Sequence, residues 1–140
     1  AHRHAQGLVR ELGLEERVTF LAGMDQKDVA RVMQQSAVLV SPSRRETLGM
    51  VLVEALACGT PVVATQSGGP ADIVTPEVGR LVPVENPEAL AEAIAQVVDT
   101  RAAYSAERLR AHALATFDWA RVTDRHLDLY RDVLAAANLS

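Results

Sequence analysis

Residues 41–65 read SPSRRETLGMVLVEALACGTPVVAT, and this stretch decides the fold. It predicts a loop, then an apolar helix from Met50 to Cys58 that ends at Gly59. A buried strand is expected to follow from Pro61 to Thr65, because this run is rich in β-branched residues. Since the helix is apolar almost all round, it must be covered on most sides, and we expect it to pack against a sheet.

Two carboxylates interrupt this apolar pattern, Glu46 before the helix and Glu54 inside it, with seven residues between them. At helical spacing such residues differ by about 80° around the axis, so both are expected to face one end of a cleft. Gly49 stands at the expected first turn, where N–H groups without a protein partner attract phosphate. Phosphate flanked by carboxylates suits a ligand with central phosphates and hydroxyl-bearing sugars on either side, which is the outline of a nucleotide-sugar.

The order of these residues resembles a known family. Glu46 and Glu54 lie within PSRRETLGMVLVEALACGTPVVAT, which is followed by Gly68-Gly69 and then by Gly79-Arg80-Leu81-Val82. This pattern is similar to that of retaining glycosyltransferases of family 4, also called group 1, whose two-domain fold is named GT-B. The spacing of the two glutamates alone is a weak signal, and the resemblance rests on the agreement of many positions in the same order.

The resemblance implies a role for each residue of the motif. Glu46 would contact hydroxyls of the donor sugar at the catalytic centre, as a sugar binder and not as a covalent nucleophile. Glu54 would accept hydrogen bonds from the ribose hydroxyls. The other predicted donor-binding residues are Thr47 and Leu48, which replace the family's usual Gly-Phe, and Gly49, Met50 and Val51, which would offer backbone N–H groups to the pyrophosphate or the sugar.

Each of these residues also has a plain structural interpretation. A carboxylate such as Glu46 stabilises a helix N-terminus by ~0.3–1 kcal/mol in any protein. Glu54 could be a surface residue at a helix edge, and Gly49 could ease a tight turn. Arg44 and Arg45, in the polar loop before Glu46, are expected to be solvated.

Three weaker candidates lie outside this motif. Met24 falls near the place where the family binds the nucleotide base. Gly68 and Gly69 would let their loop approach the ligand, or they would form a simple turn.

Composition narrows the class of protein. The chain has 140 residues, 49% hydrophobic and 23% charged, which is typical of one soluble domain. The net charge of −4 shows no basic footprint for nucleic acid or an anionic membrane. Cys58 is the single cysteine, so an internal disulfide is impossible and a cytoplasmic location is expected, with peripheral membrane association left open. The four histidines lack metal-ligand spacing, and the resemblance implies neither a metal nor a cofactor.

Strand and helix patterns alternate along the chain, which predicts an α/β fold with a Rossmann-like parallel sheet and flanking helices. Strands are expected at residues 18–22, 37–41, 61–65 and 80–84. Helices are expected at residues 3–12, 26–35 after an Asp25 cap, 50–58, from Pro87 after an Asn86 cap, 102–115, and from Asp118 to the end. The inner face of the last helix is expected to hold Trp119, Val122, His126, Leu129, Tyr130, Val133 and Leu134.

The resemblance runs from about Val18 to Val133 and is densest between Val38 and Val84. It implies that residues 1–140 are one partial domain, the later part of a C-terminal donor-binding domain, and are inactive alone. The first two strands of that domain are absent from the sequence. We therefore expect a free sheet edge from Val38 to Ser41, which would favour self-association or strand exchange.

Three functions remain open from the sequence. The chain could be part of a transferase that moves a hexose from a nucleotide-sugar, a non-catalytic module that binds a nucleotide or sugar, or a structural fragment that self-associates. The nucleotide, the sugar and the acceptor are not determined.

Overall fold

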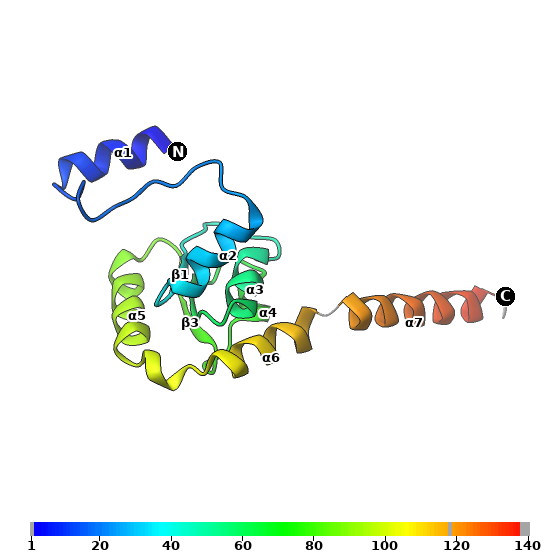
Figure 1. Cartoon of the computed structure of the whole chain (residues 1–140). Helices are drawn as coiled ribbons and strands as arrows, with labels where there is room; N and C mark the ends of the chain where they lie inside the picture. Colours follow the sequence, from blue (N-terminus) through cyan, green and yellow to red (C-terminus); the bar gives the residue numbers. More distant parts are fainter. Residues whose placement is uncertain (1, 118, 138–140) are drawn as a thin grey trace.

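The computed structural model describes residues 2–117 and 119–137 (Figure 1). The helices are α1 (His2–Glu11), α2 (Gln26–Gln35), α3 (Met50–Ala57), α4 (Pro70–Ile73), α5 (Pro87–Asp99), the 3-10 turn η1 (Arg101–Ala103), α6 (Ala106–Phe117) and α7 (Trp119–Ala137). The strands are β1 (Leu39–Ser41), β2 (Val62–Thr65) and β3 (Gly79–Val82).

Within the described residues the three strands form one parallel sheet in the order β1-β2-β3. Leu39 pairs with Val62 on one side of β2, and Val62 pairs with Gly79 on the other. Every residue of the central strand β2 is buried. Gly79 has to be glycine, because a Cβ there would collide with the carbonyl oxygen of Val62. The predicted α/β class with a parallel sheet is confirmed.

Helices cover both faces of this sheet. In Figure 1 the strands lie between α5 and α3, and α3 also contacts α2 and α6. Leu52, Ala55 and Leu56 of α3 are fully buried. The prediction that the apolar helix packs against a sheet and is covered on most sides is therefore confirmed.

The ends of the helices follow the local sequence. Gly59 adopts the left-handed conformation after α3, with φ of 84°, as a helix terminator should. The Asp25 carboxylate accepts a hydrogen bond from the Asp28 N–H at 2.8 Å and begins α2. The Asn86 side chain does the same for the Ala89 N–H at 2.9 Å and begins α5. These predicted caps are confirmed.

The strand predicted at residues 18–22 is wrong, because the structure has extended chain there without strand pairing. A strand needs a neighbour at about 4.8 Å to bond its backbone groups, and β1 ends the described sheet. Figure 1 shows α1 and this linker standing away from the core. Val18, Phe20 and Leu21 are exposed as a result.

The strand expected at residues 37–41 begins at Leu39, and two further elements also differ from the predictions. The helix expected at residues 102–115 is divided into η1 and α6 by Tyr104, whose backbone is extended and whose side chain is buried. The third strand ends at Val82 instead of residue 84, because Pro83 has no N–H for a ladder.

The expected inner face of the last helix is a further correction. Helix α7 projects from the core (Figure 1), and Leu129, Tyr130, Val133 and Leu134 are more than half exposed. Its stripe is amphipathic as predicted, but no described part of the chain covers it. The predicted cap Asp118 and the side chains of Trp119 and Val122 lie outside the described residues. Among the described helices, none has the length and apolar character needed to span a membrane.

The free edge expected from Val38 to Ser41 is present. Strand β1 is the outer strand, and its Leu39 N–H donates to the Pro61 carbonyl at 2.9 Å. Because backbone groups alternate sides along a strand, the N–H and C=O of Val40 face away from β2. Self-association at this edge stays a prediction.

Candidate functional site

Glu46 lies in the loop before α3, not on the helix itself. Four positions separate it from Met50, the first helical residue, so the predicted angle around a helix axis does not relate it to Glu54. Its place is set by backbone pairing with Gly68. The Glu46 N–H donates to Ser67 at 3.0 Å, and its carbonyl accepts the Gly69 N–H at 2.9 Å. The motif loop and the Gly-Gly loop therefore form one hydrogen-bonded unit.

The two glycines allow this close approach. A Cβ at Gly68 would lie 2.7 Å from the Glu46 carbonyl oxygen, and Gly68 has a φ of 121°. A Cβ at Gly69 would lie 2.5 Å from the Thr47 carbonyl oxygen and 2.6 Å from Leu48 Cα. The neighbour that comes close to both glycines is thus the motif loop. Their predicted contact with a ligand stays a prediction.

The Glu46 carboxylate caps the start of α3. Its Oε1 atom accepts the Gly49 N–H at 3.2 Å and lies 3.4 Å from the Leu48 N–H. One of the three N–H groups expected to be free, that of Gly49, is therefore donated to the carboxylate of the motif itself. Gly49 is buried and left-handed, with φ of 83°, so its conformation turns the chain into the helix.

The N–H groups of Met50 and Val51 remain available, since neither has a hydrogen-bond partner among the described residues. The first bond of α3 runs from the Leu52 N–H to the Gly49 carbonyl at 2.9 Å. Met50 and Val51 are 48% and 37% exposed. The opening turn of α3 thus presents two unpaired donors at the surface, next to Glu46.

The replacement of Gly-Phe by Thr47-Leu48 falls on the outside of this turn. Both residues are exposed, Leu48 by 47%. Their side chains are therefore accessible to a ligand that approaches the start of α3.

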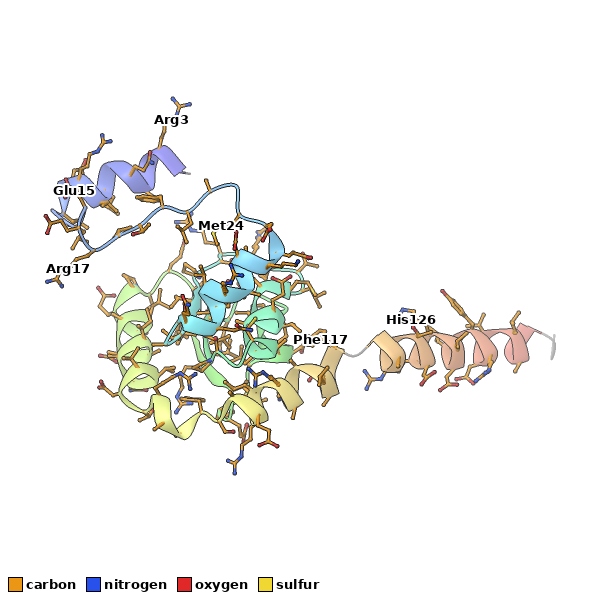
Figure 2. All side chains as sticks on the ribbon, viewed as in Figure 1. Arg3, Glu15, Arg17, Met24, Phe117 and His126 are labelled. Carbon is orange, nitrogen blue, oxygen red and sulfur yellow. The ribbon has the colours of Figure 1, made fainter. Side chains whose placement is uncertain are left out.

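Glu54 and Met24 line the same pocket, although the sequence separates them by 29 residues. This pocket of about 470 Å³ lies between α2 and α3, and its apolar wall includes Val29, Met33 and Cys58. The volume is in the range of small-molecule sites. Figure 2 shows Met24 where the linker meets the start of α2. The structure thus joins a weak candidate with a strong one, and it places Glu46 outside this pocket.

A second pocket, of about 320 Å³, opens at the carboxyl ends of the strands. Arg44 and Glu85 line it and form an ion pair, with Nε and Oε1 3.1 Å apart. Arg44 was expected to be solvated, and Glu85 was not among the expected site residues. The available signal was their position, because each residue follows closely on the end of a strand in a parallel sheet.

Comparison with known proteins now adds the family. The chain matches the family model described as glycosyl transferases group 1 over residues 3–114. D-inositol 3-phosphate glycosyltransferase of Saccharomonospora viridis is 41% identical over 138 residues, which are 96% of this chain and 32% of that protein. The protein of the same name from Mycobacteroides abscessus is 36% identical over 131 residues, 93% of this chain and 29% of the relative.

Solved structures of other proteins also match this chain. Sucrose-phosphate synthase from Thermosynechococcus elongatus matches with a TM-score of 0.85 and 38% identity, over 96% of this chain and 34% of that one. Anabaena HepE in complex with UDP matches with a TM-score of 0.81 and 29% identity, over 93% of this chain and 36% of that one. HepE in complex with UDP-glucose has a TM-score of 0.78 and 28% identity over the same shares.

The chain spans about a third of the length of these relatives. The family model covers most of its residues, and its sheet and helices superpose on solved members. This chain therefore belongs to the group 1 glycosyl transferases and has the Rossmann-like α/β architecture of part of a GT-B domain.

Proposed function

We propose that this chain is the donor-binding part of a retaining glycosyltransferase that moves a hexose from a nucleoside diphosphate to an acceptor hydroxyl. The observation that carries the proposal is the start of α3, where the N–H groups of Met50 and Val51 are unpaired among the described residues beside the Glu46 carboxylate. Such a helix start binds phosphate, and the adjacent carboxylate accepts hydrogen bonds from sugar hydroxyls.

The parts of the donor fit the two ends of this region. The nucleoside would occupy the pocket between α2 and α3, with the base near Met24 and the ribose hydroxyls on Glu54. The diphosphate would lie on Met50 and Val51. Glu46 would exchange its bonds to Leu48 and Gly49 for sugar hydroxyls.

The remaining motif residues have supporting roles in this proposal. Thr47 and Leu48 would face the sugar from the exposed side of the turn. Gly68 and Gly69 would keep the loop against the motif, where the Ser67 carbonyl and the Gly69 N–H already bond the Glu46 backbone.

The relatives suggest which substrates to test first. HepE was solved with UDP and with UDP-glucose, so we propose a uridine diphosphate hexose as donor. The curated relatives are named for D-inositol 3-phosphate, so we propose a phosphorylated polyol as acceptor. These assignments concern the longer polypeptide, because the chain spans about a third of its relatives.

The chemistry that we propose is electrostatic. Negative charge grows on the departing diphosphate, and preorganised N–H donors at a helix start stabilise it. The acceptor hydroxyl would attack from the side of the leaving group, while Glu46 holds the sugar. We propose that transfer needs no divalent metal, takes place in the cytoplasm, and does not occur in this chain alone.

An amide-shift titration of the 140-residue chain tests donor binding. UDP, UDP-glucose, GDP and ADP would be added separately, each with and without EDTA. We expect saturable shifts at Met24, Met50, Val51 and Glu54 with the uridine compounds, unchanged by EDTA. The absence of shifts at Met50 and Val51 with every nucleotide would contradict the proposal.

Substitutions in the longer polypeptide test the two carboxylates. Loss of a hydrogen bond to a charged group costs about 1.5–3 kcal/mol, so Glu54→Gln should raise the donor KM at least about tenfold. Glu46→Gln should mainly lower kcat. Glu92→Gln, on the exposed surface of α5, is the matched control. Near-normal turnover in both site variants would reject their roles, and nucleotide binding without transfer would favour a non-catalytic module.

A further inference from the structure

The pocket at the carboxyl ends of the strands is separate from the proposed donor site. Pro42 follows β1, Thr65 ends β2 and Glu85 follows β3, and the start of α5 closes the pocket. None of its residues lines the pocket between α2 and α3. Open parallel sheets bind ligands at this edge, outside the carboxyl ends of the strands.

The backbone under this pocket is held in place. The Thr65 hydroxyl donates to the Ser43 carbonyl at 2.5 Å, and Thr65 is 4% exposed. The Asn86 side chain is used in the cap of α5. The charged groups on the pocket wall are Arg44 and Glu85. Arg44 therefore combines an anchored main chain with a side chain that is 82% exposed.

The ion pair is easily exchanged. Arg44 approaches Glu85 with its Nε 3.1 Å from Oε1, and its guanidinium has no other hydrogen-bond or ion-pair partner among the described residues. Exposed ion pairs of this kind contribute little to stability. Glu85 has a φ of 58°, a conformation that non-glycine residues rarely adopt. The fold thus keeps a carboxylate beside Arg44 at some conformational cost.

We propose that this pocket is a phosphate subsite, in which a phosphate group displaces the Glu85 carboxylate from Arg44. The planar guanidinium would bind two phosphate oxygens, an arrangement that suits arginine better than lysine. Glu85 is then an internal competitor that balances the charge of Arg44 when phosphate is absent. The proposed function places the donor diphosphate on Met50 and Val51, so the phosphate of this pocket belongs to a phosphorylated acceptor; this second step rests on the proposed function.

The test uses the 140-residue chain with three probes, namely inorganic phosphate, UDP and glucose 6-phosphate, and calorimetry at fixed ionic strength. Arg44→Gln should lower the affinity for inorganic phosphate about tenfold, because a hydrogen bond from a charged group is lost. Glu85→Gln should raise the affinity for inorganic phosphate about two- to threefold, because the exposed ion pair no longer competes with phosphate for Arg44. Arg45 is a neighbouring arginine outside the pocket, so Arg45→Gln should leave the affinity for inorganic phosphate unchanged. Thermal unfolding of each variant verifies the fold.

The outcomes separate the alternatives. If Arg44→Gln weakens the binding of inorganic phosphate and glucose 6-phosphate but not of UDP, the pocket binds an acceptor phosphate. Equal weakening of UDP would show that the donor diphosphate reaches this pocket and would overturn the acceptor assignment. Unchanged phosphate affinity in Arg44→Gln, weaker affinity in Glu85→Gln, or no phosphate binding to the wild type at millimolar concentration overturns the inference. UDP binding that depends on Glu54, together with phosphate and glucose 6-phosphate binding that is unaffected by Arg44→Gln, would overturn the inference while leaving the proposed function intact.

Discussion

At the scale of single residues, Glu46 holds two neighbouring segments of the chain in place. Its carboxylate accepts the Gly49 N–H, while its backbone bonds the Gly-Gly loop. The helix start and the loop opposite are therefore positioned by the same residue. A change at Glu46 will alter the local structure as well as any sugar contact, so Glu46→Gln, which keeps the shape and an acceptor oxygen, is preferable to Glu46→Ala.

Gly69→Ala should destabilise the fold by about 1–3 kcal/mol, because the added Cβ would lie 2.5 Å from the Thr47 carbonyl oxygen and backbone must move. Urea unfolding measures the change. Gly7→Ala is the matched control, since nothing lies within 4 Å of its Cβ and alanine favours a helix. Equal stabilities of the two variants would show that the loops can separate at no cost.

Glu77 should contribute to stability in a pH-dependent way. The Thr75 hydroxyl, by hydrogen bonding to its carboxylate, lowers the pKa of Glu77 below its usual value. A lowered folded-state pKa stabilises the protein above the unfolded-state pKa, and this contribution is lost as the pH falls through the folded-state value.

Between neutral and acid pH, the urea midpoint of unfolding should therefore fall less in Thr75→Val than in the wild type. Thr100→Val is the control, because that hydroxyl donates to the Gln96 carbonyl instead of a carboxylate. A decline in Thr75→Val as steep as in the wild type would contradict the interaction.

At the scale of elements, α3 is the helix around which the core is organised. Its apolar side chains contact the sheet, and α6 packs along it and reaches its C-terminal end. There the Arg110 Nε donates to the Ala57 carbonyl at 3.3 Å, and Arg101 donates to the Gly59 carbonyl at 3.1 Å. Cations at this end of a helix are favourable. Helix α3 is thus held at its far end while its first turn remains open.

Leu56→Ala should cost about 2–5 kcal/mol of unfolding free energy, since Leu56 is fully buried in α3 and a cavity would remain. Leu114→Ala in α6 is the control, because Leu114 is 65% exposed. Chemical denaturation measures the free energy of unfolding of both variants. A similar loss in both variants would mean that α3 is not the centre of the core.

At the scale of the whole molecule, apolar surface remains on elements that extend from the core. Exposed apolar side chains lie at Leu8 and Leu12, in the linker at residues 18–22 and along the stripe of α7. These segments stand away from the core in Figure 1 and Figure 2. The outer edge of β1 is also unpaired within the described sheet. Exposed strand edges and apolar faces favour association.

We therefore expect the 140-residue chain to self-associate as its concentration rises, and sedimentation velocity would measure this. Val40→Pro removes the N–H that faces away from β2, so it should reduce association through the β1 edge. Val84→Pro, after the end of β3, is a comparison outside that edge. A wild type that stays monomeric at high concentration would contradict the expectation.

Much of the fold is readable from local sequence. The caps at Asp25 and Asn86 and the stop at Gly59 depend on residues within a few positions of each other. The order of strands and helices follows from periodicity, and the motif around Glu46 and Glu54 indicates the family. None of these inferences needs to know which distant segments meet.

What the sequence determined by itself was the family, the α/β class and the apolar helix of the site. Tertiary structure decided that residues 18–22 form no strand, that α7 lies uncovered, and that Met24 shares a pocket with Glu54. It also decided that the Glu46 carboxylate occupies the Gly49 N–H and that Arg44 pairs with Glu85. The physical reason is that helix ends respond to nearby residues, whereas strand pairing, close backbone approach and ion pairs depend on groups that only the folded chain brings together.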